Sequence, residues 1–412
     1  MWRPTDKFLL SSLLPTEASG HRLRRLLDER RAHIDWEAVL ERGRYHLLLP
    51  LIRYNLAQID GLKQLPPAII EGLQAEAGIW AAREMAYVNE ARNLLVALQT
   101  HGIEAFPLKG VALMLGGYYP QAGLRPAQDI DLIVSPAQLD IADDLLESLG
   151  CAPLPGKRSL RARQRLANER NHLWPRRSPG GMVIELHHRA FQFTPRERDF
   201  GFAQIRENAR IAEAGFLPLP SPTDLALHLI HHTMVDMQSA QAILRTVVDL
   251  YFIFRKDPEA VEALRRRGAE FGFPGAIRLA EQSVNHLAVA NLEALEVDVA
   301  HPELALLLET ALMSSHSHLA EAARFLEYFN FSHRPWQKAG TIASLLFPTR
   351  AHLQQLYDAP QGGSAFPWQY LRRPLDLLRK IDWRSLRPAN LRRLKKLRSA
   401  VLGIGGIKRK GG

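Results

Sequence analysis

Cysteine is almost absent from this chain. Its 412 residues include one, Cys151, which cannot form an internal disulfide or a cysteine-rich zinc site. The composition therefore favours a reducing compartment, and we expect a cytoplasmic protein. A long apolar run is also missing, because the longest stretch without a charged side chain, residues 110–124, contains glycines, a proline and two tyrosines. A membrane span needs about 20 mostly apolar residues, so no transmembrane segment is predicted.

Excess positive charge is confined to one end of the chain. The net charge is +10, but residues 371–412 hold 14 of the 53 basic side chains and 2 of the 43 acidic ones. The remaining residues carry 39 basic and 41 acidic groups, so the body is close to neutral. The basic character therefore belongs to the tail, and the body does not have the charge that is typical of nucleic-acid-binding proteins.

Hydrophobic periodicity and turn signals divide the chain into four regions. Apolar residues make up 46% and charged residues 23%, which are ordinary values for a globular protein. We predict an α+β fold in which a small mixed β-sheet forms a core, with extensive helical regions before and after it. The predicted parts are an N-terminal helical region (1–100), an α/β core (101–220), a helical domain (221–358), and a linker with a basic amphipathic tail (359–412).

Two predicted strands of the core carry acidic residues. Asp129-Ile-Asp-Leu-Ile-Val134 alternates acidic and apolar side chains and then becomes apolar, which is typical of a strand with one polar face. Asp129 and Asp131 therefore point to the same side of this strand. Glu185 lies among apolar residues of a second predicted strand, 182–187. Three carboxylates on neighbouring strands can hold one or two Mg²⁺ ions, which prefer oxygen ligands and leave positions for phosphate oxygens.

These residues stand in a pattern that resembles a known superfamily. Lys109-Gly110, Arg125, Asp129-Ile-Asp131 and Glu185-Leu-His187 look like the motifs of the uncharacterised nucleotidyltransferases in the DNA polymerase beta superfamily. The pattern is most similar to the bacterial group with Lys-Gly in its first motif and Arg-x-x-x-Asp-x-Asp in its second. The superfamily usually has Gly-Ser or Gly-Gly where this chain has Lys-Gly, and a shorter gap than the 19 positions between Gly110 and Asp129.

The resemblance implies a fold, a reaction and a role for each motif residue. It implies a mixed sheet surrounded by helices, and transfer of a nucleoside monophosphate from an NTP such as ATP to an acceptor, with Mg²⁺ or Mn²⁺. Asp129, Asp131 and Glu185 would bind metal, and Glu185 could serve as base near the acceptor hydroxyl. The phosphate contacts would come from Lys109, Gly110 and Arg125.

Several histidines and one charged pair have alternative interpretations. His187 ends the second acidic strand, where it would either orient Glu185 or bind phosphate, or serve as a structural hydrogen-bonding residue. His228 and His232 have the i, i+4 spacing of zinc ligands, but packing of their helix against the core is the alternative that we favour. Arg245 and Asp249 have the same spacing, and we expect an ion pair between them within one helix, with a contribution to the active site as the alternative.

Two basic segments also leave alternatives open. Residues 156–177 contain eight basic side chains and one acidic one, which either form a solvated surface or hold phosphate. In the tail, Leu391, Leu394, Leu397 and Val401 recur among arginines and lysines, which predicts a basic amphipathic helix. This helix could cover the body, or contact an anionic membrane surface or a nucleic-acid backbone.

The preferred functional hypothesis is a metal-dependent nucleotidyltransferase with an unidentified hydroxyl or phosphate acceptor. This acceptor could be a small molecule, a sugar, a peptide or a protein. One alternative is a nucleotide-sensing or partner-binding module without turnover, and another is an RNA-modifying nucleotidyltransferase. The three carboxylates favour the enzyme, because binding without catalysis has less need of them.

Overall fold

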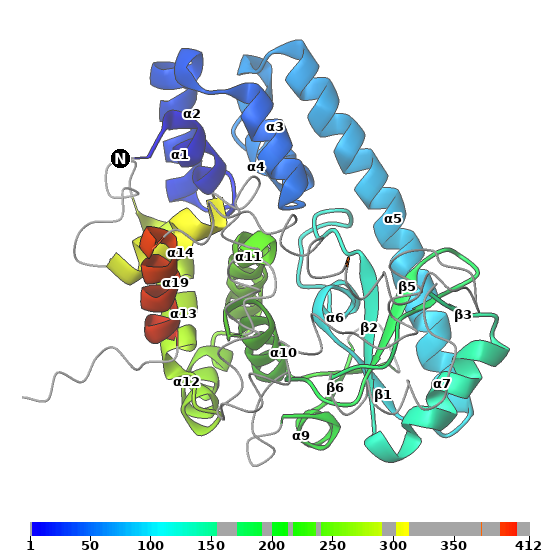
Figure 1. Ribbon diagram of the computed structural model, residues 1–412. Helices are drawn as coiled ribbons and strands as arrows, with labels where there is room; N and C mark the ends of the chain where they lie inside the picture. Colours follow the sequence, from blue (N-terminus) through cyan, green and yellow to red (C-terminus); the bar gives the residue numbers. More distant parts are fainter. Residues whose placement is uncertain are drawn as a thin grey trace, which may run out of the picture.

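A small β-sheet lies at one side of a largely helical molecule (Figure 1). The computed structural model describes residues 2–154, 171–191, 200–212, 217–235, 240–290, 302–312, 372 and 388–401. It confirms the predicted α+β fold. The predicted division into four regions stays a prediction, and residues 359–371, which include the start of the predicted linker, lie outside the described residues.

The N-terminal region, up to Thr100, is helical, as predicted. It comprises α1 (Pro4–Ser11), α2 (Glu17–Arg30), α3 (Trp36–Tyr45), α4 (Leu49–Ala57) and α5 (Pro67–Thr100), with short 3₁₀ turns at Arg31–His33 and Gly61–Gln64. The long helix α5 has no internal proline and is about 50 Å long at the standard rise per residue. It packs against α4 near its start and against the strand β1 (Ala105–Pro107) and the helices α6 (Lys109–Leu115) and α7 (Leu139–Ser148) further on. It therefore connects the helical layer to the sheet.

The sheet has five strands in the order β1-β2-β5-β4-β3. Besides β1 these are β2 (Asp129–Val134), β3 (Ala152–Pro153), β4 (Arg176–Arg177) and β5 (Val183–His187). The central strands β2 and β5 run parallel, and Asp131 is in register with Glu185. Apolar side chains of β2 are fully buried because α5, α6 and α7 cover the sheet. After β2 the chain forms a 3₁₀ turn, Pro136–Gln138, which leads into α7.

The second half is again helical. A short helix α9 (Phe202–Glu207) and a hairpin of β6 (Arg210–Ile211) and β7 (Pro218–Leu219) lead to α10 (Pro222–Ile230), α11 (Ala240–Lys256), α12 (Ala260–Glu270), α13 (Pro274–Val289) and α14 (Pro302–Leu312). At its end, α10 passes into a π turn at His231–Val235. None of the described helices combines the length and the apolar character that a bilayer crossing requires.

The basic amphipathic helix of the tail is present as α19 (Pro388–Val401), and it packs against α13 and α14 (Figure 1). Leu397, Ala400 and Val401 are buried in that contact, whereas Lys395 and Lys396 are exposed. This arrangement agrees with the first of the three alternatives, a helix that covers the body. Insertion into a membrane would need these three apolar side chains, which are here already buried.

Arg176 of β4 connects the sheet to α7. Its guanidinium binds both carboxylate oxygens of Asp143, at 2.5 and 2.9 Å, and also Glu147 and the carbonyl of Cys151. Arg176 is 2% exposed and Asp143 is 5% exposed. This member of the basic segment 156–177 therefore has a structural role, and most of the other members lie outside the described residues.

We predict that Arg176→Met lowers the free energy of unfolding by about 3 kcal/mol, because the substitution removes the bidentate partner of the buried Asp143 carboxylate. Urea unfolding followed by circular dichroism measures this change. The control is Arg177→Gln at the neighbouring exposed position, for which we expect a change within about 0.5 kcal/mol. Equal effects of the two substitutions would contradict a structural role specific to Arg176.

Candidate active site

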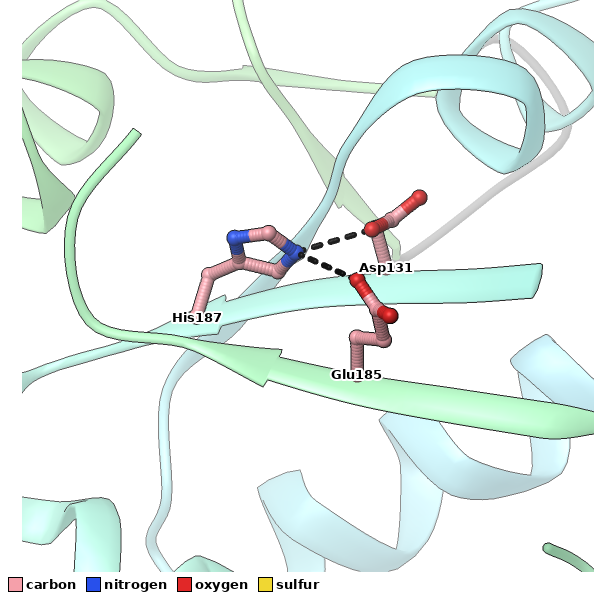
Figure 2. A group of neighbouring side chains, drawn as sticks. All are labelled: Asp131, Glu185 and His187. Carbon is pink, nitrogen blue, oxygen red and sulfur yellow. Dashed lines mark hydrogen bonds and ion pairs between the residues drawn. The ribbon is translucent and has the colours of Figure 1, made fainter. Parts of the chain in front are cut away.

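The acids of the two central strands meet where β2 and β5 run side by side. Figure 2 shows Asp131 on β2 facing Glu185 and His187 on β5. One ligand atom of each residue lies within 4.8 Å of the other two. The parallel register produces this arrangement, because Asp131 is paired with Glu185 and His187 lies two residues further along the same face.

Two side chains, Lys109 and His187, bind the Asp131 carboxylate. It is 1% exposed, and its Oδ1 accepts hydrogen bonds from Lys109 Nζ and from His187 Nε2, both at 2.8 Å. Burial raises the pKa of Asp131, but Lys109 and His187 together lower it by more than burial raises it. The pKa therefore lies well below its usual value. Asp131 is therefore an ionised carboxylate at neutral pH, in a site from which water is largely excluded.

Lys109 has a backbone conformation that is unusual for a side-chain-bearing residue. Its φ is +48°, in the left-handed region that favours glycine. It is the first residue of α6 and takes the first position of the pair that is Gly-Ser or Gly-Gly in the superfamily. Burial lowers the pKa of Lys109, whereas Asp131, Asp129 and Glu185 raise it more, so the amine stays charged. The strained backbone is of the kind found at functional sites.

Gly110 has a steric reason to be glycine. A Cβ at this position would lie 3.1 Å from the Cβ of Ala127 and 3.2 Å from Nη1 of Arg125. The start of α6 and the segment leading into β2 are therefore in close contact. Gly110 and Arg125, two of the motif residues, are brought together by this contact.

Asp129 lies two residues before Asp131 but is not part of the compact group of Asp131, Glu185 and His187. Burial and the negative charge of Asp131 raise the pKa of Asp129 to about 6, against the opposing effect of Lys109. Arg245 of α11 also lowers this pKa, so the helical layer contributes a positive charge on this side. The assignment of Asp129 as a metal ligand stays a prediction.

His187 is bound on both sides of its ring. Its Nδ1 lies 3.3 Å from Nδ2 of Asn171, and its Nε2 also lies 3.6 Å from Oε2 of Glu185. Burial lowers the pKa of His187, but the hydrogen bonds to Asp131 and Glu185 raise it more. His187 therefore lies between the two acids and is nearer to Asp131, and its predicted role in orienting Glu185 or binding phosphate stays a prediction.

The neighbouring residues Asn171 and His172 were not found from the sequence. Nε2 of His172 lies 3.9 Å from Oε2 of Glu185, and the His172 ring lies 5.2 Å from the ring of His187. Burial, the largest cause, lowers the pKa of His172 to about 4, so this imidazole is neutral. The sequence gives no signal for either residue, because the backbone bridge between His172 and His187 is a tertiary contact.

The predicted ion pair between Arg245 and Asp249 is wrong, because Asp249 binds Arg125 instead. Arg125 Nε and Nη2 lie 2.6 and 2.8 Å from the two carboxylate oxygens of Asp249. Tyr119 also donates to Asp249, at 2.6 Å. Both Arg125 and Asp249 are almost fully buried, at 5% and 0% exposure. The segment before β2 is therefore fastened to α11 by a bidentate contact.

A second carboxylate fixes the loop before β2 from the opposite side. Glu84 of α5 accepts a hydrogen bond from the backbone N–H of Gly123 at 2.8 Å. Gly123 has φ +87°, and a Cβ there would lie 2.9 Å from Ala81 of the same helix. Burial, the largest cause, raises the pKa of Glu84. The loop that carries Arg125 is therefore held between α5 and α11.

His228 lies in α10, which packs against α6 of the core, and this packing is the alternative that we favoured for His228 and His232. His228 Nδ1 donates to the carbonyl of Ala190 at 2.9 Å, and burial lowers the pKa of both histidines well below the usual value. Across the described residues, the group of Asp131, Glu185 and His187 is the one found with metal-ligand spacing. The ring of His228 lies 6.5 Å from that of His187, so α10 supports the site from behind.

The donor set of this group fits a divalent metal. Two carboxylates supply the hard oxygen ligands that Mg²⁺ and Mn²⁺ prefer, and an imidazole is compatible with Mn²⁺. Lys109 and His187 compensate the negative charge of Asp131. These contacts would rearrange if an ion took their place beside Asp131.

Comparison with known proteins agrees with the geometry. A family described as uncharacterised nucleotidyltransferase matches residues 32–288, which is more than half of the chain and includes every motif residue. No curated protein and no solved structure matches the chain.

The raised pKa of Asp129 leads to a prediction about stability. The unfolded carboxyl titrates near 3.8 and the folded one near 6, so its ionisation opposes folding as the pH rises through this window. We expect Asp129→Asn, without divalent metal, to melt about 2 °C or more above the wild type at pH 8. The difference shrinks as the pH falls to 4, which thermal unfolding across pH measures.

The matched control for this prediction is Asp140→Asn, which changes an exposed aspartate at the start of α7. We expect it to leave the pH dependence of melting unchanged. An Asp129→Asn variant whose melting temperature differs from the wild type by the same amount at pH 4 and pH 8 would show that Asp129 does not titrate near 6.

Proposed function

The chain belongs to an uncharacterised nucleotidyltransferase family, and from this premise we propose that it transfers a nucleoside monophosphate from an NTP to a hydroxyl or phosphate acceptor, with Mg²⁺ or Mn²⁺. The observation that carries the proposal is the register of two parallel strands, which sets Asp131 beside Glu185 with Lys109 bound to the same aspartate. An ionised carboxylate pair with an adjacent ammonium group suits a metal-bound polyphosphate.

We assign metal binding to Asp131 and Glu185, with Asp129 as a further ligand once its proton is lost. A bound divalent ion would neutralise phosphate charge and polarise the phosphorus centre. Glu185 is the most exposed of the three residues in the compact group, at 19% for its side chain. Burial, the largest cause, raises the pKa of Glu185, but the His187 hydrogen bond and the charge of Lys109 act together to lower it below its usual value. Glu185 is therefore ionised and able to accept a proton from an acceptor hydroxyl.

Lys109 would move from Asp131 towards the phosphates. Its amine lies 2.8 Å from Oδ1 of Asp131. A metal ion on Asp131 would take over this compensation, which leaves the ammonium group available to a phosphate oxygen. Lys109 would thereby contact phosphate with a positive charge, at a position where the superfamily contacts phosphate with a backbone N–H or a hydroxyl group.

The sequence predicted a phosphate contact for Arg125. We assign this contact to Arg245 and a positioning role to Arg125. The Arg125 guanidinium is taken up by Asp249 and by the carbonyl of Pro126, so we assign it to positioning the segment before β2. Within the described part of the chain, no hydrogen bond or ion pair is found for Arg245, although burial, the largest cause, lowers its pKa to about 10. An unpaired, poorly hydrated guanidinium near Asp129 is suited to a phosphate.

The first test of the function is thermal unfolding with each NTP, with and without Mg²⁺. Ligand at about 100 times its dissociation constant stabilises the folded state by roughly 2.7 kcal/mol, which shifts the melting temperature measurably. We expect a Mg²⁺-dependent shift in the wild type and its loss in Asp131→Asn. Asp140→Asn serves as the control that retains the shift. Absence of any shift with all four NTPs would reject the proposed substrate.

The assignment of Arg245 gives a separate prediction. We expect Arg245→Gln to weaken binding of the Mg²⁺–NTP complex about tenfold, which isothermal titration calorimetry measures. Without nucleotide, the variant should be at least as stable as the wild type, because a buried charge without a partner has been removed. Arg266→Gln, on the exposed face of α12, is the control. Unchanged nucleotide affinity in Arg245→Gln would assign the phosphate contact elsewhere.

A further inference from the structure

A cavity of about 620 Å³ lies between the N-terminal helices and the end of α11. Its walls come from α2, α4, the segment 117–120 after α6, and the last turns of α11. This volume is that of a typical small-molecule site. None of the residues assigned to the catalytic group lines it.

The cavity is separate from the candidate active site. Lys109 begins α6, whereas Gly117 lies beyond the other end of this helix. On α11, Arg245 is seven residues before Phe252, which lines the cavity, so about 10 Å of helix separates the two. A ligand in the cavity would therefore not occupy the site of metal and phosphate.

Positive charge predominates around the cavity. Arg24, Arg255 and Lys256 line it, against Glu17 as the one acidic residue of the lining. Lys256 Nζ is bound to the carbonyl of Gly116 at 2.9 Å. Within the described chain, Arg24 and Arg255 make no hydrogen bond or ion pair with a protein group, and both are exposed. Two arginines without protein partners at one cavity suit a phosphate group.

Aromatic rings form a large part of the wall, and hydrogen bonds fix two of them. Tyr119 and Phe252 have ring centroids 4.4 Å apart. The Tyr119 hydroxyl donates to Asp249, and the Tyr118 hydroxyl accepts from Arg210. The planes of Tyr119 and Phe252 are tilted by 43° to each other, and together with Tyr54 they give an aromatic wall that is formed before a ligand arrives.

One buried polar atom of the lining has no partner. Asn55 is 3% exposed, and its amide nitrogen donates to the carbonyl of Ser12 at 2.8 Å. Its Oδ1 has no hydrogen-bond partner in the described structure, although it is buried. A buried acceptor without a donor is costly, and a ligand that carries a hydroxyl or N–H group would satisfy it.

We propose that this cavity binds a small phosphate monoester that carries a planar ring and hydrogen-bond donors. The arginines Arg24 and Arg255 would hold the phosphate, the tyrosine and phenylalanine rings would contact the planar group, and Asn55 would accept from a donor. The cavity is a second ligand site, and this proposal does not depend on the proposed function. Tyr119 of the cavity wall donates a hydrogen bond to Asp249, and Asp249 also binds Arg125.

The probe for this site is flavin mononucleotide, which combines a planar ring, hydroxyl groups and a phosphate monoester. Riboflavin has the same ring and chain without the phosphate, so the pair isolates the contribution of the charge. Binding is followed by flavin fluorescence without divalent metal, on the wild type and on Asp131→Asn. We expect flavin mononucleotide to bind both proteins equally, and at least tenfold more tightly than riboflavin.

Variants place the bound probe in the cavity. We expect Arg255→Gln to weaken binding of flavin mononucleotide at least tenfold, and Arg266→Gln, outside the cavity, to leave it unchanged. Tyr54→Ala should weaken both flavins. The proposal is overturned if flavin mononucleotide does not bind, if riboflavin binds as tightly, or if Arg255→Gln has no effect. Loss of binding in Asp131→Asn would instead place the probe at the catalytic acids and also reject a separate site.

Discussion

The burial of one carboxylate at the junction of two parallel strands is the constraint on which this molecule depends. Asp131 is almost inaccessible to water, yet it stays ionised because Lys109 and His187 both bind the same oxygen. Such a charge is stable only where its partners are fixed in place. The left-handed backbone of Lys109 and the register of β2 with β5 are the features that bring those partners to it.

The helical layer is organised around this junction. Asp249 on α11 binds Arg125 before β2, and Glu84 on α5 binds the backbone of the same loop. Two helices from distant parts of the sequence therefore hold the strand that carries the acids. Since Tyr119 also bonds to Asp249, the wall of the cavity and the segment before β2 share one carboxylate. A ligand that displaces Tyr119 would therefore affect both the cavity wall and the segment before β2.

Much of this was predictable from local patterns. The alternation around Asp129 and Asp131 predicted the strand, and its apolar remainder predicted that the strand is buried. The N-terminal region was predicted to be helical, and α5 is its longest helix. Sequence spacing failed where the partner was remote. Asp249 and Arg245 are four residues apart, which is the spacing of an ion pair on one helix. Asp249 binds Arg125 instead, through a buried bidentate contact.

The sequence by itself determined the elements, the α+β class and the acids, because hydrophobic period and residue type are local properties. The tertiary structure alone decided which acids meet. It joined Asp131 with Glu185 and His187, added His172 beside them, and left Arg245 without a hydrogen-bonding partner among the described residues. The physical reason is that the register of parallel strands depends on a long crossover connection and on the packing of helices on the sheet, which no short window of sequence contains.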